Sequence, residues 1–311
     1  MRRALLLFAL LVATTAPGSS RVAPESLPAK VDAYLAPYVA AGDFNGTVLL
    51  AKEGKVLVRK GYGFANRELG VANGPETKFQ IASVSKTFMA ATVVLLDRQG
   101  LLRIGDPLSK YLPDFPRGDE IKLSHLLEHS SGVPDIYSLP EYPDLKRRPV
   151  SLDEMIALLA TKPLDFTPGS QSSYSNSGYA LLAAVVRKVT GKTYHEVLRE
   201  KVLEPLHLEH TGVWDRQALL PGRAAGYEAW LGPAGLINSP YADESILIGS
   251  GDLYSTVDDL YAWYRAVREG KLFALARSPC LMAGGRENAS GTTLSSRTAT
   301  TRDSWRTSGP I

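Results

Sequence analysis

The fold is decided by Phe79-Gln80-Ile81-Ala82-Ser83-Val84-Ser85-Lys86-Thr87-Phe88, which leads into a largely apolar stretch at 87–96 that predicts a helix. Ser83 and Lys86 are three positions apart at the start of this helix, so their side chains lie on one face, one turn apart. A serine hydroxyl becomes a good nucleophile when a neighbouring base takes its proton, and a lysine in a desolvated site loses basicity. The helix N-terminus places backbone N–H groups where they stabilise a developing oxyanion. The spacing therefore predicts a serine nucleophile, although a plain helix start with an exposed lysine fits the same four residues.

A second motif, Tyr174-Ser175-Asn176, lies in a serine-rich loop before a predicted helix at 179–189. Taken alone, Tyr174 and Asn176 fit an ordinary loop tyrosine and a helix cap. Two more segments follow the same order along the chain: Leu126-Leu127-Glu128-His129-Ser130-Ser131-Gly132-Val133-Pro134-Asp135 and Gly249-Ser250-Gly251-Asp252-Leu253-Tyr254-Ser255-Thr256-Val257-Asp258-Asp259-Leu260. Together these four segments, within residues 31–273, resemble the serine β-lactamase and penicillin-binding-protein superfamily. The similarity is greatest to its class C β-lactamase, D-alanyl-D-alanine carboxypeptidase and esterase branch.

The resemblance implies a role for each matched residue. Ser83 would be the acylated nucleophile, and its backbone N–H would form part of the oxyanion hole, whose second donor is not assigned. Lys86 would share the serine proton. Tyr174, with its basicity tuned by Lys86, would act as general base in acylation and activate water in deacylation, as a coupled titration. Asn176 would bind the substrate's amide side chain and Lys86. A β-lactam, a D-alanyl peptide or a small ester would be the substrate, with no metal or organic cofactor.

The resemblance also implies a mixed α/β fold, with an antiparallel sheet flanked by helices and an all-helical lobe, and the site between lobe and sheet. Sequence patterns predict a hairpin of strands at 46–52 and 55–65. They predict helices at 31–41, 87–96, 124–129, 152–160, 179–189, 194–202 and 257–269. No other strands are predicted from the sequence patterns, and because a lone hairpin is marginal in water, we predict low stability for this chain.

The family's third motif, K-T-G or H-x-G on a late strand, is not found after residue 273. Gly191-Lys192-Thr193-Tyr194 and His210-Thr211-Gly212 come too early, and neither lies on a predicted strand. Residues 286–311 carry 11 Ser or Thr in 26 positions and show no strand or helix periodicity. The C-terminal strands of the family are therefore predicted to be missing or replaced. The tail fits either an out-of-frame product or a natural short variant with a disordered end.

Three regions follow: a signal peptide at 1–20, an incomplete serine-hydrolase domain at 21–275, and a polar tail at 276–311. The first region has a basic start, Met1-Arg2-Arg3, and ten apolar residues at 4–13, which are too few to span a bilayer comfortably. We expect export to a bacterial periplasm or exterior, with no stable membrane anchor after cleavage. Without Arg2 and Arg3, 33 basic residues face 32 acidic ones, a net charge of +1 that does not suggest a nucleic-acid partner. The expected partner is a small molecule or a peptidoglycan peptide, and the oligomeric state is not predicted.

Two other classes of function remain open. His125-Leu126-Leu127-Glu128-His129 matches the H-x-x-E-H motif of zinc hydrolases, in which a helix presents both histidines on one face. No candidate for a third ligand stands out. Alternatively, if the late strands are absent, the chain is a non-catalytic or inactive penicillin-binding-like module.

Overall fold

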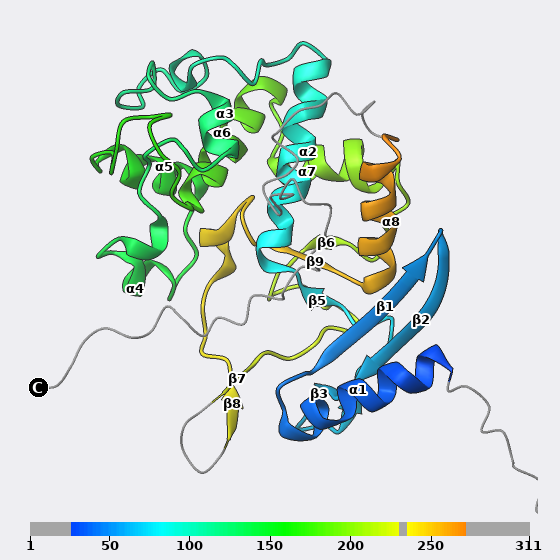
Figure 1. Ribbon diagram of the computed structural model, residues 1–311. Coiled ribbons are helices and arrows are strands. Elements are labelled where there is room, and N and C mark those ends of the chain that lie inside the picture. The colour runs from blue at the N-terminus through cyan, green and yellow to red at the C-terminus, as the bar shows by residue number, and fades with distance from the viewer. Residues whose placement is uncertain (1–25, 230–234, 272–311) are drawn as a thin grey trace, which may run out of the picture.

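A computed structural model describes residues 26–229 and 235–271. The predicted signal peptide and polar tail lie outside the described residues. The helices are α1 (Leu27–Ala41), α2 (Ser85–Arg98), α3 (Leu123–Leu127), α4 (Tyr142–Leu145), α5 (Leu152–Ala160), α6 (Ser177–Thr190), α7 (Tyr194–Leu198) and α8 (Val257–Arg268). The strands are β1 (Gly46–Lys52), β2 (Lys55–Tyr62), β3 (Phe64–Asn66), β4 (Val71–Ala72), β5 (Phe79–Gln80), β6 (Gly212–Val213), β7 (Tyr227–Ala229), β8 (Leu236–Asn238) and β9 (Leu253–Ser255). Figure 1 shows helices α2 to α7 forming a lobe above the strands, so the predicted mixed α/β architecture is confirmed.

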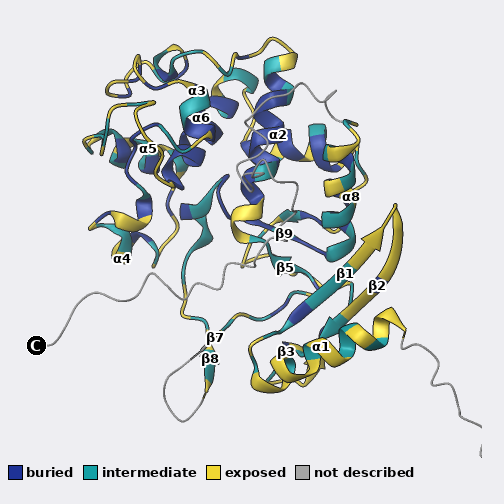
Figure 2. Ribbon diagram, viewed as in Figure 1, coloured by how far each residue is buried: buried dark blue, intermediate teal, exposed yellow. Residues whose placement is uncertain are grey.

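The helical lobe is built around two helices that are apolar on nearly every side. Within α2, ten of its residues from Ser85 to Leu96 are buried, and α6 is buried continuously over 177–186. Helices that are hydrophobic all round are found inside a core, and Figure 2 shows both as the darkest elements of the lobe. Each fully buried large aliphatic or aromatic side chain contributes about 1.5–3 kcal/mol. The N-terminal ends of α2 and α6 are therefore rigidly placed, and the site residues come from those two ends.

The predicted hairpin is confirmed as β1 and β2, which pair antiparallel. The second strand was predicted to run to residue 65, which is wrong, because Gly63 interrupts it. Gly63 has φ +68°, a conformation that favours glycine, and a Cβ there would lie 2.2 Å from Asn45 Oδ1. The chain then continues as β3, which pairs with β4.

The expectation that the hairpin would be the only pair of strands is also wrong. A three-stranded antiparallel sheet has the order β5-β9-β6, with Gln80 and Gly212 both opposite Tyr254. These strands have two or three residues each, too few to show an alternating pattern in the sequence. The His210-Thr211-Gly212 segment, predicted to lie off any strand, in fact leads into β6. This sheet holds the segment before Ser83 against the segment after the Gly249–Asp252 turn.

All seven predicted helices are present, and α2, α6 and α8 differ from their predicted bounds by at most two residues at either end. Helix α1 begins at Leu27, earlier than predicted, because the Ser26 side chain caps it by accepting from the Ala29 N–H. The helix predicted at 124–129 ends at Leu127, since His129 has φ +57°. The helix predicted at 194–202 continues as a π-helix at Arg199–Leu203. Helix α5 has its predicted bounds, with Ser151 accepting from the Glu154 N–H.

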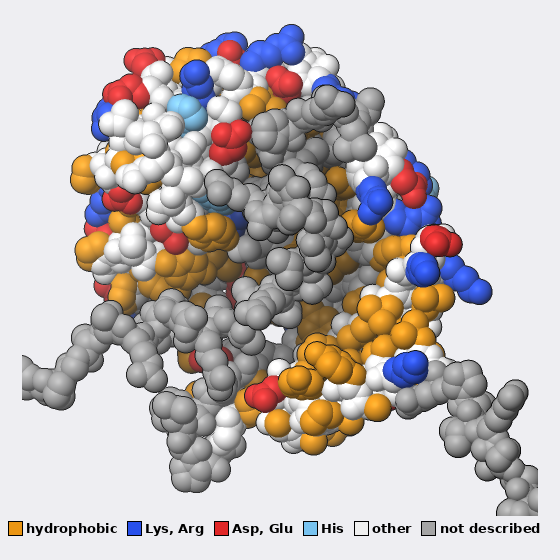
Figure 3. Space-filling view, in the orientation of Figure 1, with side chains coloured by type: hydrophobic (Ala, Val, Ile, Leu, Met, Phe, Trp, Pro, Cys, Tyr) orange, Lys and Arg blue, Asp and Glu red, His pale blue; other side chains and the backbone are white. Residues whose placement is uncertain are grey.

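The hairpin lies at one end of the molecule, where it contacts α1 and α8. Three of its apolar side chains, Leu50, Val56 and Leu57, are exposed. Figure 3 shows hydrophobic side chains gathered over this end of the molecule. A contiguous apolar patch of this kind is uncommon on soluble monomers. None of the described helices is long and apolar enough to cross a bilayer.

Candidate active site

Ser83 lies in a single 3₁₀ turn, Ala82–Val84, between β5 and α2. Its neighbour Ala82 has φ +43°, a left-handed conformation that costs a non-glycine residue about 1–2 kcal/mol. Such strain at one residue is typical of functional sites. The sharp turn leaves Ser83 exposed at the N-terminus of α2, while Lys86, in the first turn of that helix, is 6% exposed.

The structure brings together the four residues singled out in the sequence. Ser83 Oγ lies 2.5 Å from the Tyr174 hydroxyl and 3.2 Å from Lys86 Nζ. Lys86 Nζ also donates to Asn176 Oδ1 at 2.7 Å and to the backbone carbonyl of Ser250 at 2.8 Å. Ser250 was not predicted as a site residue, although it lies in one of the four matched segments. Three acceptors thus surround one lysine nitrogen.

This arrangement defines where a proton can move. A lysine ammonium has three N–H bonds, and the three acceptors use all of them. In neutral Lys86, bonds to Asn176 and Ser250 occupy the two remaining N–H groups, so the lone pair faces Ser83 Oγ. Burial lowers the pKa of Lys86 to about 8, against the opposing charges of Asp135 and Asp252. The ammonium is therefore still the main form near physiological pH, but far more of the neutral amine is present than for a lysine in water.

Asp135 fixes the orientation of the Asn176 amide. Its Oδ1 accepts from the Asn176 backbone N–H at 2.9 Å and from Asn176 Nδ2 at 3.1 Å. Because a carboxylate only accepts, the amide nitrogen must face Asp135 and the amide oxygen must face Lys86. Burial raises the pKa of Asp135, while its bonds from Asn176 and the charge of Lys86 act in the opposite direction. Sequence reasoning missed this residue, although it ends the matched segment at 126–135.

Tyr174 is held by two neighbours besides Ser83. Its ring stacks on His129, with centroids 4.6 Å apart, and Lys86 Nζ lies 4.8 Å from its ring centroid. Burial and the charge of Lys86 lower the pKa of His129 to about 4, so this ring is neutral. Burial, together with the charge of Asp135, raises the pKa of Tyr174, although its bond with Ser83 acts in the other direction. Tyr174 is therefore a neutral phenol at neutral pH.

The H-x-x-E-H segment does not have the geometry of a zinc site. His125 lies in α3, whereas His129 lies beyond the helix end, so the two rings do not share a helix face. His125 Nδ1 accepts from the Lys122 N–H and His129 Nδ1 from the Ser175 N–H, each at 3.2 Å. Over 26–229 and 235–271, no three His, Cys, Asp or Glu side chains group closely enough to hold a metal ion. The segment instead supports the loop that carries Tyr174.

A β-lactamase family model matches residues 31–310, most of the chain. The chain is 31% identical over 245 residues to the teichoic acid D-alanine hydrolase of Staphylococcus aureus, covering 79% of this chain and 58% of that protein. It is 29% identical over 238 residues to the putative penicillin-binding protein PbpX of Bacillus subtilis, covering 76% and 58%. The crystal structure of FmtA from Staphylococcus aureus superposes with a TM-score of 0.68 at 32% identity, covering 79% of this chain and 66% of that one.

The fold and the family match define the class of protein: the chain belongs to the β-lactamase family, whose relatives here are serine hydrolases and penicillin-binding-protein-like proteins. The predicted resemblance to that superfamily is confirmed. The matched range runs beyond residue 273, where the motif-based similarity ended, into residues outside the described part. The chain spans a little over half the length of the curated relatives it matches.

Proposed function

We propose that this chain is an exported serine hydrolase that forms an acyl-enzyme on Ser83 and then hydrolyses it. The observation that carries the proposal is the placement of Lys86 Nζ 3.2 Å from Ser83 Oγ, with two further acceptors that orient its lone pair toward that oxygen. A plain helix start would leave this lysine in solvent. Here it is buried, with a pKa lowered to about 8, which supports a role as base.

In the proposed acylation, Lys86 takes the hydroxyl proton of Ser83 while Oγ forms a bond to the substrate carbonyl carbon. The Ser83 backbone N–H, at the N-terminus of α2, is one donor to the resulting oxyanion. As the tetrahedral intermediate collapses, the bond to the leaving group breaks and the Tyr174 hydroxyl protonates that group. The proton taken up by Lys86 then restores Tyr174. In deacylation, Tyr174 passes its proton to Lys86 and takes one from water, and the water oxygen forms a bond to the acyl carbon. The bond from that carbon to Ser83 Oγ then breaks, and Lys86 returns the proton to Oγ.

The directions of the two pKa shifts support Lys86 as the proton acceptor and Tyr174 as the proton donor. The family resemblance implied that Tyr174 is the general base. A phenol whose pKa is raised is a poor base at neutral pH but a competent proton donor. Lys86, whose pKa is lowered to about 8, is the better acceptor in the resting enzyme. The two groups share one serine oxygen, so their titrations are coupled.

The proposed substrate is an ester or amide of D-alanine, either a D-alanyl ester or the end of a peptidoglycan peptide. The name of the Staphylococcus aureus relative, teichoic acid D-alanine hydrolase, supports the ester, and similarity to a penicillin-binding protein supports the peptide. Asn176 would bind the substrate's amide, the role that the family resemblance implies. Export rests on the signal-like residues 1–20, which would place the enzyme in a bacterial periplasm or outside the cell.

The proposal is tested by the intact mass of the protein after incubation with a penicillin. We expect an adduct of one penicillin on the wild type and none on Ser83→Ala, with circular dichroism showing that both are folded. Turnover of a D-alanyl ester, followed by release of D-alanine, then separates esterase from peptidase activity. Absence of both an adduct and turnover in folded protein would overturn the proposal and favour a non-catalytic penicillin-binding-like module.

A further inference from the structure

The carbonyl that accepts from Lys86 belongs to a tight turn, Gly249–Asp252. The Ser250 and Gly251 N–H groups both donate to the Leu247 carbonyl, at 2.7 and 2.9 Å. Gly249 has φ +72°, and a Cβ there would lie 2.5 Å from Met89 Cε. The same Cβ would lie 3.0 Å from the backbone carbonyl oxygen of Tyr179, so the turn packs directly against both α2 and α6. The direction of the Ser250 carbonyl therefore depends on how this turn is held.

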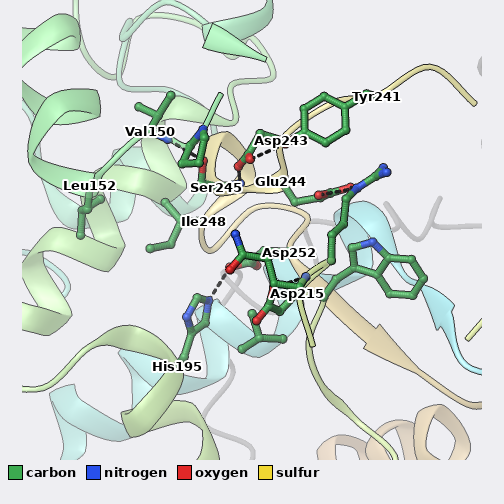
Figure 4. A pocket seen from close by; sticks show the side chains of 15 residues that line it. Val150, Leu152, His195, Asp215, Tyr241, Asp243, Glu244, Ser245, Ile248 and Asp252 are labelled. Atoms are coloured by element: carbon green, nitrogen blue, oxygen red, sulfur yellow. Dashed lines mark hydrogen bonds and ion pairs between the residues drawn. The ribbon is translucent and has the colours of Figure 1, made fainter. Parts of the chain in front are cut away.

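One buried carboxylate, Asp252, bonds to the backbone of the turn. Asp252 is 3% exposed, and its Oδ2 accepts from the Gly249 N–H at 3.0 Å. The same oxygen lies 2.6 Å from His195 Nε2, which projects from α7. Figure 4 shows this pair at a cavity of about 370 Å³, bordered also by Val150, Ile248 and Glu244. His195 and Asp252 both line this cavity, and their bond links α7 to the turn.

We propose that Asp252 and His195 are positioning residues for Lys86. Together they fix the Gly249–Asp252 turn, so that the Ser250 carbonyl stays in line with one N–H of Lys86 and the lone pair of the neutral amine faces Ser83. Neither residue touches the reacting atoms. This inference rests on the proposed function for its effect on turnover, but not for its effect on Lys86 itself.

The charge of Asp252 adds an electrostatic component to this positioning. Asp252 and Asp135 both favour the protonated form of Lys86, against the burial that disfavours it. Removal of either carboxylate charge therefore makes Lys86 easier to deprotonate. The other groups that surround the Lys86 ammonium are Ser83, His129, Tyr174, Asn176 and Tyr179.

The test uses the full chain with lysine labelled by ¹³C at Cε, and follows the Lys86 signal, assigned by its loss in Lys86→Met, as a function of pH. Asp252→Asn keeps the shape and removes the charge, so the midpoint of the Lys86 titration should fall by about one pH unit. His195→Gln keeps a donor near Nε2 and should titrate like the wild type. His195→Ala loses the donor, so its Lys86 signal should broaden or move. His210→Ala is the matched control, because His210 is exposed and contacts Asp259 through its backbone.

Turnover gives a second readout. We expect His195→Ala to lower kcat about tenfold with KM within twofold, since a small misplacement affects the chemical step, and His195→Gln to restore kcat. The inference would be overturned if Lys86 titrated as in the wild type in both Asp252→Asn and His195→Ala. It would also be overturned if His195→Gln had the same lowered kcat as His195→Ala while Lys86 titrated normally. If no Ser83-dependent turnover exists, the proposed function fails, but the titration still decides this inference.

Discussion

The burial of Lys86 predicts an unusual pH dependence of stability. Its pKa is about 8 in the folded protein and 10.5 when unperturbed, and the side chain is 6% exposed, so solvent screening is small. Between these two values the unfolded chain binds more protons than the folded one, and the free energy of unfolding therefore rises with pH. From pH 7 to pH 9.5 the gain from this one group is about 2 kcal/mol. Below pH 7 the group is protonated in both states and contributes no slope.

The measurement is urea unfolding followed by tryptophan fluorescence at pH 7 and pH 9.5, for the wild type and for Lys86→Met. Methionine fills similar space without a charge, so the difference between the two proteins cancels the titration of groups that do not interact with Lys86. With a urea slope of about 3 kcal/mol/M, the wild-type midpoint should gain about 0.7 M over that of the variant. Equal shifts of the urea midpoint between pH 7 and pH 9.5 in the two proteins would refute the reasoning. They would show that Lys86 titrates in the folded protein as it does in water.

Three other substitutions test the framework around the site. Asp135→Ala should cost about 1–3 kcal/mol of stability by urea unfolding, because it leaves the buried N–H groups of Asn176 without an acceptor; a neutral result would contradict the assigned amide orientation. Gly249→Ala should destabilise clearly more than Gly191→Ala, which has a similar positive φ but open space around it, and equal losses would show that the steric contact is relieved. Ser151→Ala should lower stability by about 1 kcal/mol through loss of the α5 cap, so an unchanged melting temperature would argue against that cap.

The sequence could predict those features of the fold and site that depend on the spacing of nearby residues. Ser83 and Lys86 share a helix face because they are three positions apart, and α5 has its predicted bounds because its cap and its apolar pattern agree. The same local reasoning failed for β5, β6 and β9, which exist only because each finds a partner, and for residues 128–129, where a left-handed backbone ends the helix early.

The parts of the site that sequence reasoning missed are set by contacts between distant residues. Lys86 and Ser250 are 164 positions apart, and His195 and Asp252 are 57 apart. Asp135 could have been suspected, since it ends a matched segment, but its bond to Asn176 spans 41 positions. No periodicity encodes these pairs. They follow from the packing of α2, α6 and α7 against one another and from the β5-β9 pairing.

The proposed chemistry has two parts, activation of Ser83 and binding of the substrate with its oxyanion. The groups that would activate the nucleophile come from the ends of α2 and α6, from the Asp135 loop and from the Gly249–Asp252 turn, all within the described residues. The third motif that the family uses would instead pair with substrate and supply a second oxyanion donor. The groups proposed to activate Ser83 therefore all lie within the described residues, whereas no second oxyanion donor is assigned among them. For this reason, labelling of Ser83 by a reactive β-lactam is a more direct test of the described site than turnover of any natural ester.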